Sequence, residues 1–504
     1  MMTGKNFKAI VVGGGPMGLT AAHALSKTGI DFVVLEREPV VVKDKGATLI
    51  VAPHTMRALS QFGLRDQLLS VAAEAGDMHT VTSDGWLYYI QRAGDLMKSS
   101  LGCCLYAFGR VDVVRVLYDG LGGLDKARVL INKKVVDVMA DDFGVTVRCE
   151  DGTKYDGSIV IGADGVHSLV RQRMRTLALQ ASPNLEANED KPFPSEYRLL
   201  WCCIPFQGEE NGGPPGSMWA THANNASVNY FVHYNKAWLL IYERLPAPTR
   251  ERARYTEEDI ITVGERLGHL AICDTLKIRD VFAQRDMAGL VNLEEGVLKH
   301  WAWGRMALVG DSAHKFTPNL GLGFNNGVQD VFALTNELYN VLNGPSQGEQ
   351  YGGDVKKAMN NSPSTEALSA AFQRYQESRI QRCTEDFDSS VTLTRMCAWP
   401  NTYYWFIDWW IMPLLPRWLE VQLIKNTAIN RFKKAYILDF LDGEEPFEVG
   451  TVPWENPIGS RSPRTLENDK SRKSAGFPFW RVLGICCIGF ALAAVSIKGH
   501  YRVF

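Results

Sequence analysis

Three glycines near the start of the chain have the spacing of a dinucleotide-binding loop: Gly13, Gly15 and Gly18. They follow an apolar, β-branched run at 7–12 and precede a helical pattern, and Glu36 ends the next apolar run. Such glycines let backbone amides at a helix N-terminus approach a pyrophosphate, and a carboxylate at the second strand end accepts from ribose hydroxyls. The pattern predicts dinucleotide binding. Glu36 followed by Arg37 is compatible with FAD and with a nicotinamide cofactor.

Two later segments also place an acid directly after an apolar run. IVIGADGVHS contains Asp164, and GRMALVGDSAHKFTPNLGLGF contains Asp311 ahead of a turn with Pro318, Gly321 and Gly323. An acid at a strand end can hold ribityl hydroxyls, and a glycine-rich helix N-terminus can lie close to a flavin ring and stabilise its anionic reduced form. Together with the first loop, these segments favour a flavin site.

The elements that must position these residues begin with a βαβ unit. FKAIVV and DFVVLERE are typical of buried parallel strands, and LTAAHALSKTG between them is typical of a helix. Further strand-like runs occur at 129–138, 145–149 and 157–162. From about 191 to 285, YRLLWCCIPF, SVNYFVHY and WLLIYERL follow one another without long helices between them, which predicts an inserted antiparallel sheet.

Three fingerprints, GGGPMG, ADGVHS and GDSAHKFTPNLGLGFNNGVQD, resemble in this order those of single-component flavin monooxygenases of the aromatic hydroxylase type, over about residues 7–340. Within that group, LEEGVLKHWAWGRMALVGDSAHKFTPN is most similar to fungal epoxidases that act on prenylated indole (indole-diterpene) or meroterpenoid intermediates. The resemblance implies an FAD, NADPH or NADH as a transient reductant without its own Rossmann domain, and O2 as co-substrate. The residues that it places at the FAD are Glu36, Arg37, Ala47, Ile50, Arg110, Asp164, Asp311, Pro318, Gly321, Gly323 and Phe324.

The expected fold is therefore α/β. It combines an FAD-binding, Rossmann-like βαβ domain with an interleaved mixed or antiparallel β-sheet substrate domain, a helical C-terminal region and an apolar tail. The expected divisions are 1–190 (first part of the FAD-binding domain, with interleaved substrate-domain strands), 191–285 (substrate-domain sheet), 286–345 (completion of the FAD-binding domain), 346–450 (helical, Trp-rich region), 451–476 (polar linker) and 477–504 (apolar membrane anchor).

Two polar residues on the inserted strands, Arg198 and Tyr230, are the candidate catalytic residues. They are expected on the floor of the substrate pocket, where either could orient or activate a substrate oxygen. The alternative for both is a role at the rim or within the sheet. His314 is expected to be a helix-cap neighbour rather than a general base, and His167 a turn residue. The sequence contains no metal-ligand constellation, so no metal is expected.

Composition limits the class of protein. Lys plus Arg number 54 and Asp plus Glu 56, a balance that provides no positive field for nucleic acid. The 504 residues require at least two cores or one core with large insertions. The ten cysteines lack CxxC spacing and are expected to be reduced thiols.

The C-terminal run Val482–Ile497 has 16 residues, fewer than the roughly 20 of a spanning helix. Because it follows a polar linker, we expect a single-pass or tail anchor in a membrane such as the endoplasmic reticulum, with the catalytic body facing the cytosol. The alternative is a last helix that docks back on the body. Five tryptophans in Trp399–Trp418 fit either a packed core or a membrane interface.

The sequence thus predicts an FAD-dependent monooxygenase that uses NAD(P)H and O2 to epoxidise a prenyl double bond of a lipophilic secondary metabolite. Hydroxylation of an aromatic or phenolic ring by the same chemistry is the first alternative. A flavin dehydrogenase or reductase of the same fold is the second, and a membrane-tethered binding protein without flavin is the third. The intact Asp311–Gly323 turn argues against the third.

Overall fold

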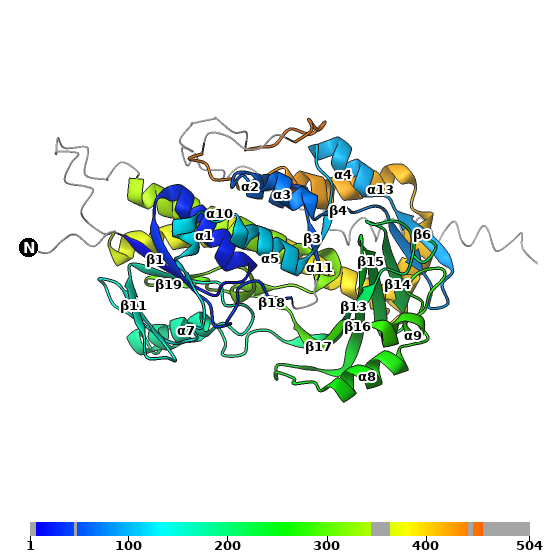
Figure 1. Cartoon of the computed structure of the whole chain (residues 1–504), viewed down its shortest axis with the longest axis horizontal. Helices are drawn as coiled ribbons and strands as arrows, with labels where there is room; N and C mark the ends of the chain where they lie inside the picture. The colour runs from blue at the N-terminus through cyan, green and yellow to red at the C-terminus, as the bar shows by residue number, and fades with distance from the viewer. Residues whose placement is uncertain (1–6, 45–47, 344–362, 442–446, 457–504) are drawn as a thin grey trace, which may run out of the picture. The chain divides into compact units, whose positions relative to one another are not determined.

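The first apolar runs of the sequence form the middle of a six-stranded sheet, in the order β19-β20-β12-β1-β2-β8 (Figure 1). Its strands are β1 (Lys8–Val12), β2 (Asp31–Leu35), β8 (Val129–Leu130), β12 (Ile159–Gly162), β19 (Ala302–Trp303) and β20 (Met306–Leu308). The pairs are parallel except β19 with β20. Nearly all side chains of β1 and every one of β12 are buried, as expected for central strands covered on both faces.

The computed structural model describes residues 7–44, 48–343, 363–441 and 447–456. All of them belong to one compact unit that spans residues 1–459. The predicted linker beyond residue 456 and the apolar tail 477–504 lie outside the described residues. Among the residues that are described, no helix is both long enough and apolar enough to cross a bilayer.

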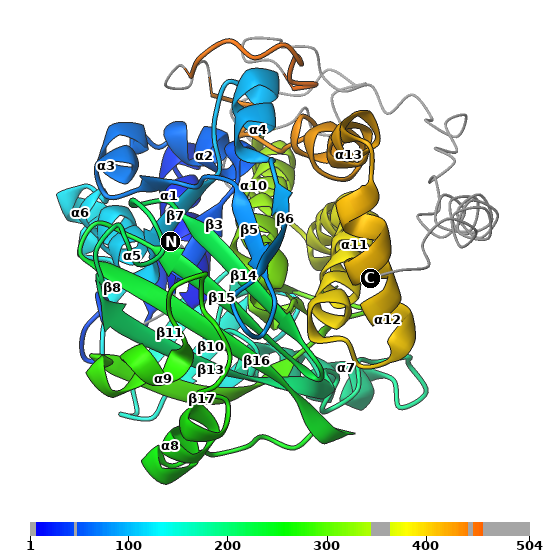
Figure 2. The same cartoon turned by 90° about the vertical axis from the view of Figure 1, so that its right-hand side faces the viewer.

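A second, seven-stranded sheet has the order β17-β13-β16-β15-β14-β5-β6 (Figure 2). Its strands are β5 (Met78–Val81), β6 (Leu87–Gln91), β13 (Ser195–Pro205), β14 (Met218–Ala223), β15 (Ala226–Val232), β16 (Lys236–Thr249) and β17 (Met287–Glu294). All neighbours are antiparallel except β14 with β5. The structure contains the predicted antiparallel sheet. Strands β5 and β6 come from within 1–190, where interleaved substrate-domain strands were expected but not located individually.

Three small sheets complete the strands. They consist of β3 (Thr48–Val51), β7 (Tyr106–Gly109) and β4 (Ala73–Glu74); of β9 (Val135–Ala140), β10 (Val145–Cys149) and β11 (Lys154–Gly157); and of β18 (Gly296–Val297) and β21 (His314–Lys315). The run predicted as one strand at 129–138 is therefore divided between β8 and β9, which belong to different sheets.

The helices up to the middle of the chain connect these sheets. They are α1 (Pro16–Thr28), α2 (Pro53–Ser60), α3 (Arg65–Ser70), α4 (Gly94–Leu101), α5 (Arg110–Asp119), α6 (Gly123–Lys126), α7 (Leu169–Ala181), α8 (Glu257–Arg266), α9 (Ile278–Val281) and the short η1 (Phe282–Gln284), η2 (Gly310–Ser312) and η3 (Pro318–Leu320).

The C-terminal part of the described chain is helical, as predicted. Its helices are α10 (Leu322–Asn343), α11 (Thr365–Ala398), α12 (Thr402–Phe406), η5 (Ile407–Ile411), η6 (Met412–Leu414), α13 (Arg417–Ile424), η7 (Lys425–Ile429) and α14 (Asn430–Phe432). Helix α10 packs against α1 and α11. Helix α11 contacts β19 of the first sheet and β14, β15 and β16 of the second, so it connects the two sheets (Figure 1).

Separate cores form on the two faces of the seven-stranded sheet. One face packs Leu200, Val228 and Ile241 against α8 and α9. The other face packs Leu199, Phe231 and Leu240 against Ala398 of α11 and Ile50 of β3. We call these the outer face and the inner face. The inner face therefore lies toward α11 and β3. The eight cysteines within the described residues are free and buried, which agrees with reduced thiols.

Candidate functional site

The glycine-rich loop between β1 and α1 is closely packed. Gly13 has φ +104°, and a Cβ there would lie 2.5 Å from the carbonyl oxygen of Ala163. A Cβ on Gly18 would lie 1.8 Å from the Gly13 carbonyl oxygen, whereas one on Gly15 would meet nothing within 4 Å. Gly15 caps α1 without any side-chain hydrogen bond, and Pro16 follows. The first amides of α1 therefore face open space, as a pyrophosphate requires.

Glu36 closes the loop from the second strand. Its carboxylate accepts from the backbone N–H of Gly14 at 2.6 Å and from that of Glu38 at 2.8 Å. These bonds fix the orientation of the Glu36 carboxylate beside the glycine-rich loop. The Arg37 side chain is 69% exposed and lies 4.0 Å from a Glu38 oxygen. It therefore points toward solvent.

Arg110, the first residue of α5, lies between two of the predicted acids. Burial lowers the pKa of its guanidinium, and the negative charges of Asp311 and Glu36 oppose that shift. No side-chain hydrogen bond joins the Arg110 guanidinium to another described residue. A partly buried guanidinium without a partner is suited to a ligand that carries phosphate or carbonyl oxygens.

Asp164 has a different contact from the one expected. Its Oδ2 accepts from the N–H groups of Leu169 and Val170 at 2.7 and 3.1 Å, so it caps the start of α7. Its Oδ1 is buried and has no partner, and burial raises the pKa of the carboxyl group. The preceding Ala163 supports Gly13. In this geometry Asp164 stabilises the segment before α7, which packs against the glycine-rich loop.

Asp311 lies in η2, at the carboxyl end of β20. Lys315 donates to its Oδ2 at 2.5 Å, and its Oδ1 lies 3.8 Å from the Cβ position of Gly323. The preceding Gly310 has φ +59°, which favours glycine. Asp311 thus lies next to the start of α10, where the sequence placed it.

The turn before α10 is fitted against β3. A Cβ on Gly321 would lie 2.9 Å from the Cβ of Ile50. The Asn325 amide donates to the carbonyl oxygens of Ile50 and Gly321 at 2.8 and 2.6 Å, and its Oδ1 accepts from Ala52 N–H at 2.9 Å. Asn325 was not predicted, because its role depends on a partner strand 275 residues away. Asn325 therefore joins Ile50 of β3 to Gly321 of the turn before α10.

The remaining predicted residues of this turn are in place. Pro318 begins η3, and Phe324 lies in the first turn of α10 and packs against the core of the first sheet. Thr394 of α11 donates to Asn319 Oδ1 at 3.0 Å and lies 2.7 Å from Thr317 Oγ1, so α11 also holds the turn. Ala47 lies outside the described residues.

A buried ion network around Asp330 stabilises the turn that contains Asp311. Asp330 Oδ2 lies 2.5 Å from His314 Nε2 and accepts from Gly310 N–H at 3.0 Å, and its Oδ1 accepts from Arg379 Nε at 2.9 Å. Burial alone would lower the pKa of His314, but its neighbours Cys383 and Asp330 raise it to about 10.

His314 is therefore a charged structural residue rather than a general base. His314, Asp330 and Cys383 have ligand atoms within 4.8 Å of one another, but Arg379 already provides the positive charge there. His167 lies 3.7 Å from Glu294 in the loop before α7, as a turn residue.

The two candidate catalytic residues do not reach this site. Arg198 donates to Glu243 at 2.8 Å and lies over the ring of Tyr255, and Tyr230 is fully buried in the core with α8 and α9. Both side chains are on the outer face. The prediction that they form the pocket floor is corrected by the structure, because alternation along a strand fixes which residues share a face but not which face meets the cofactor.

The inner face carries its own row of polar side chains. Cross-strand pairing places Tyr242 of β16 beside Ser227 of β15, and Ser227 beside His222 of β14. Tyr242 Oη and Ser227 Oγ are buried and make no hydrogen bond within the described residues. Because buried hydroxyls ordinarily have a partner, these two are available to a ligand. We call Tyr242, Ser227 and His222 the polar row.

His222 is held by a carboxylate from the helical region. Asp408 Oδ2 lies 2.8 Å from His222 Nδ1 and accepts from Tyr88 Oη at 2.7 Å and Trp399 Nε1 at 2.9 Å. Burial alone would lower the pKa of His222, but the charge of Asp408 raises it well above its ordinary value. His222 is thus fixed at one end of the polar row, with its Nδ1 bound by Asp408.

These residues fit FAD. The uncapped N-terminus of α1, the fixed Glu36 carboxylate and the unpartnered Arg110 follow one another along the dinucleotide path. The path ends at the turn of Gly321 and Ile50, and Ile50 also packs against the inner face of the second sheet. A reacting ring at that end would face the polar row.

Comparison with known proteins agrees with this geometry. A family described as FAD binding domain matches residues 6–351. The FAD-dependent monooxygenase srdH of Neurospora crassa is 31% identical over 473 residues, which cover 90% of this chain and 99% of that protein. The FAD-dependent monooxygenase cdmI of Talaromyces verruculosus is 30% identical over 509 residues, which cover 100% of this chain and 98% of that protein.

Solved structures share the fold at lower identity. HpxO of Klebsiella pneumoniae, complexed with FAD and uric acid, has a TM-score of 0.65 and 18% identity, with 85% of this chain and 98% of that chain covered. p-Nitrophenol 4-monooxygenase PnpA of Pseudomonas putida has a TM-score of 0.63 and 20% identity, with 84% and 97% covered.

Proposed function

Since the chain belongs to the FAD-dependent monooxygenases, we propose that it transfers one oxygen atom of O2 to a prenyl double bond of a lipophilic, meroterpenoid-like secondary metabolite. The enzyme is an oxidoreductase with FAD as its cofactor. The proposed product is an epoxide. The second oxygen atom leaves as water, with two electrons and a proton from NADPH or NADH and a further proton from solvent.

The observation that carries the proposal is the position of the turn before α10 against the inner face. Ile50 packs on Gly321 and also belongs to the apolar cluster of that face, which includes Leu199, Phe231 and Leu240. An apolar surface at the reacting end of the site favours a substrate that is itself largely apolar.

Bound FAD supplies the electron transfer and the oxygen activation. The chain's own residues bind and orient. The amides of α1 and the Arg110 guanidinium would hold phosphate and carbonyl oxygens, Glu36 would hold a ribose hydroxyl, and Asp311 would hold the ribityl chain. The packed inner face would exclude water from the reacting end of the site and so limit side reactions.

The polar row supports the assignment of a substrate that also has an oxygen function. Tyr242 Oη and Ser227 Oγ make no hydrogen bond within the described residues, and His222, held by Asp408, lies beside Ser227. A phenol or carbonyl oxygen bonded to these groups would fix the position of the apolar chain along the inner face. An olefin would then be presented to the turn of Gly321.

We further propose membrane association through residues 477–504, with the body on the cytosolic side. Support comes from the apolar composition of Val482–Ile497, which follows a polar linker in the sequence. This segment lies outside the described residues.

The test is product analysis. The purified, flavin-loaded chain is incubated with NADPH, O2 and a panel of farnesylated or geranylgeranylated phenols, and the products are examined by mass spectrometry and NMR. We expect a product one oxygen heavier whose side chain gives a diol on treatment with acid.

The alternatives give different products. A new hydroxyl group on the ring would identify an aromatic hydroxylase instead. Oxidation of substrate without oxygen incorporation would identify a dehydrogenase.

A further inference from the structure

A group of large apolar side chains is exposed where the second sheet meets the helices after α11. Its members come from the start of β6 and from the segment α12–α13, and we call them the aromatic face: Trp86, Leu87, Trp405, Phe406, Trp410, Leu414 and Trp418. Trp418 is 71% exposed, Trp86 63%, Leu414 57% and Trp410 50%. Soluble proteins seldom expose this many large apolar side chains together without a partner.

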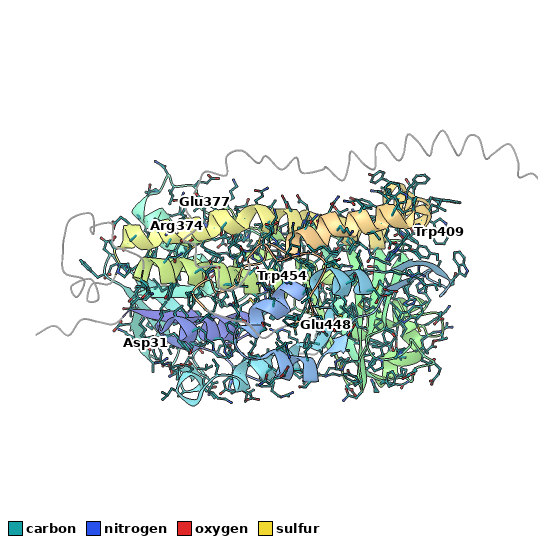
Figure 3. All side chains as sticks on the ribbon, turned by 90° about the horizontal axis from the view of Figure 1, so that it is seen from above. Asp31, Arg374, Glu377, Trp409, Glu448 and Trp454 are labelled. Carbon is teal, nitrogen blue, oxygen red and sulfur yellow. The ribbon has the colours of Figure 1, made fainter. Side chains whose placement is uncertain are left out.

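The two parts of the aromatic face are in contact. Trp409 of η5 lies between them, with its ring 6.1 Å from that of Trp86 and 4.9 Å from that of Tyr88. Strand β6 also contacts η6. Figure 3 shows the labelled Trp409 at an edge of the ribbon where ring side chains project outward. The aromatic face is therefore one surface rather than scattered residues.

The inner side of the same helical segment is already occupied. Ile407, Asp408 and Ile411 are buried, and Asp408 is fixed by Tyr88, His222 and Trp399. A helix that buries one side normally shows polar residues on the other. Here the opposite side carries Trp405, Phe406 and Trp410. Internal packing therefore does not account for these exposed rings.

Few exposed charges without a partner lie around the aromatic face within the described residues. Over residues 401–419 the acidic residue is the buried Asp408, and the exposed Arg417 pairs with Glu420 at 2.6 Å. Beyond them, the exposed Lys425 and the exposed Asp84, in the turn before Trp86, carry opposite charges. A surface rich in tryptophan and poor in net charge suits the interface between membrane and water, where tryptophan, with an apolar ring and a polar N–H group, concentrates.

We propose that the aromatic face docks the folded body on the interfacial region of a lipid bilayer. The proposal is independent of the reaction and of the C-terminal tail, because every residue in it is described and belongs to the folded unit. The sequence of the apolar tail points to the same partner. Asp408 connects the two surfaces, since it anchors η5 under the aromatic face and also holds His222 in the polar row.

The test measures lipid contact at single positions of the full chain. Cys486 and Cys487 are replaced by serine, which leaves only the buried cysteines of the described residues and avoids labelling in the tail. The variants Trp410→Cys and, separately, Trp418→Cys then carry the environment-sensitive dye NBD. The matched control is Phe143→Cys, because Phe143 is 90% exposed in the turn between β9 and β10, away from the aromatic face.

Each labelled protein is mixed with phosphatidylcholine vesicles containing phosphatidylserine, with and without a nitroxide-labelled lipid. At positions 410 and 418 we expect NBD emission to rise about twofold or more and the nitroxide lipid to quench it. The dye at position 143 should respond to neither. Flavin absorbance, measured on the same samples, shows that the site is intact whatever the lipid result.

Two results would overturn the proposal. If dyes at 410 and 418 respond no more than the dye at 143, the aromatic face remains in water while the tail alone binds. If they respond without vesicles and in proportion to protein concentration, the aromatic face is a contact between copies of the chain.

Discussion

Gly18 shows how one missing side chain makes room for the cofactor. A Cβ at this position would lie 1.8 Å from the Gly13 carbonyl oxygen, so Gly18→Ala must displace the loop. We expect the Kd for FAD to rise by about tenfold to a hundredfold, in line with the roughly 1–3 kcal/mol of overpacking. Flavin titration followed by visible absorbance measures this change. Gly122→Ala is the control, since a Cβ there meets nothing within 4 Å; equal affinities in the two variants would refute the packing argument.

The charge on His222 gives a pH-dependent prediction. Because folding raises its pKa, the stabilisation that it provides is complete below its unfolded pKa of about 6.5 and is lost as pH rises through the folded value. Asp408→Asn removes the carboxylate that causes the shift. The difference in Tm between wild type and this variant should therefore shrink as pH is raised from about 6 to 9. A difference that does not depend on pH would mean that His222 is neutral in the native protein.

Residues with a local motif could be predicted from the sequence, and residues defined by distant partners could not. Gly18 and Glu36 have their partners within one βαβ unit, so their spacing was sufficient. Gly13 also packs against Ala163, which only the fold brings near. Asn325 and Asp330 lie in the same helical run as many ordinary polar residues. Only the fold brings β3 to Asn325 and Arg379 to Asp330.

Which face of the seven-stranded sheet a side chain lies on determines whether it can contact the proposed substrate. Tyr242→Phe and Ser227→Ala each remove an unpartnered hydroxyl from the inner face. We expect each to lower kcat/KM by about five- to twentyfold, equal to about 1–2 kcal/mol for a hydrogen bond to substrate, without a change in FAD affinity. Steady-state kinetics with the accepted substrate measures the effect.

The control for these variants is Thr221→Val. Thr221 is a buried hydroxyl next to His222 in sequence, but it bonds to Ala271 on the outer face. Its kcat/KM should remain close to that of wild type. If Thr221→Val lowers kcat/KM as much as Tyr242→Phe does, the inner face has no special role in substrate binding.

The ion pairs between α10 and α11 differ in burial, and we expect them to differ in their contribution to the free energy of unfolding. Asp330→Ala leaves Arg379 and His314 buried without their counter-charge, so we expect a loss of about 3–5 kcal/mol in the free energy of unfolding. Glu337→Ala breaks the more exposed pair with Arg374, 2.7 Å long, between the same helices and should cost about 0–1 kcal/mol. Urea denaturation compares them. Similar losses would show that the buried network is not what joins the helices.

The element order was more predictable than the sheet membership. The parallel strands and the antiparallel insertion follow from runs of apolar residues and from the absence of long helices between them. Strands β5 and β6 could not be located individually, because β5 pairs with β14, about 140 residues later in the sequence, and β6 joins the sheet only through β5. The inner and outer faces could not be told apart for the same reason, since tertiary contacts with α8, α11 and β3 define them.

Across the whole molecule, α11 connects the cofactor site, the substrate sheet and the aromatic face. Its middle donates Arg379 to the ion network, Thr394 holds the turn of Pro318, and its C-cap Trp399 donates to Asp408. Within the described residues, one helix thus contacts both large sheets, and its C-cap bonds to the residue beneath the aromatic face (Figure 1). The sequence predicted a helical region there but gave no indication of these connections.

We propose that this arrangement performs flavin-dependent oxygen transfer. To test this, the purified, flavin-loaded chain is given NADPH, a prenylated phenol and isotopically labelled O2, and the label is followed into product by mass spectrometry. We expect one labelled oxygen atom in the product and O2 uptake that the prenylated substrate stimulates. Product that contains oxygen from water, or flavin reduction without any labelled product, would contradict it.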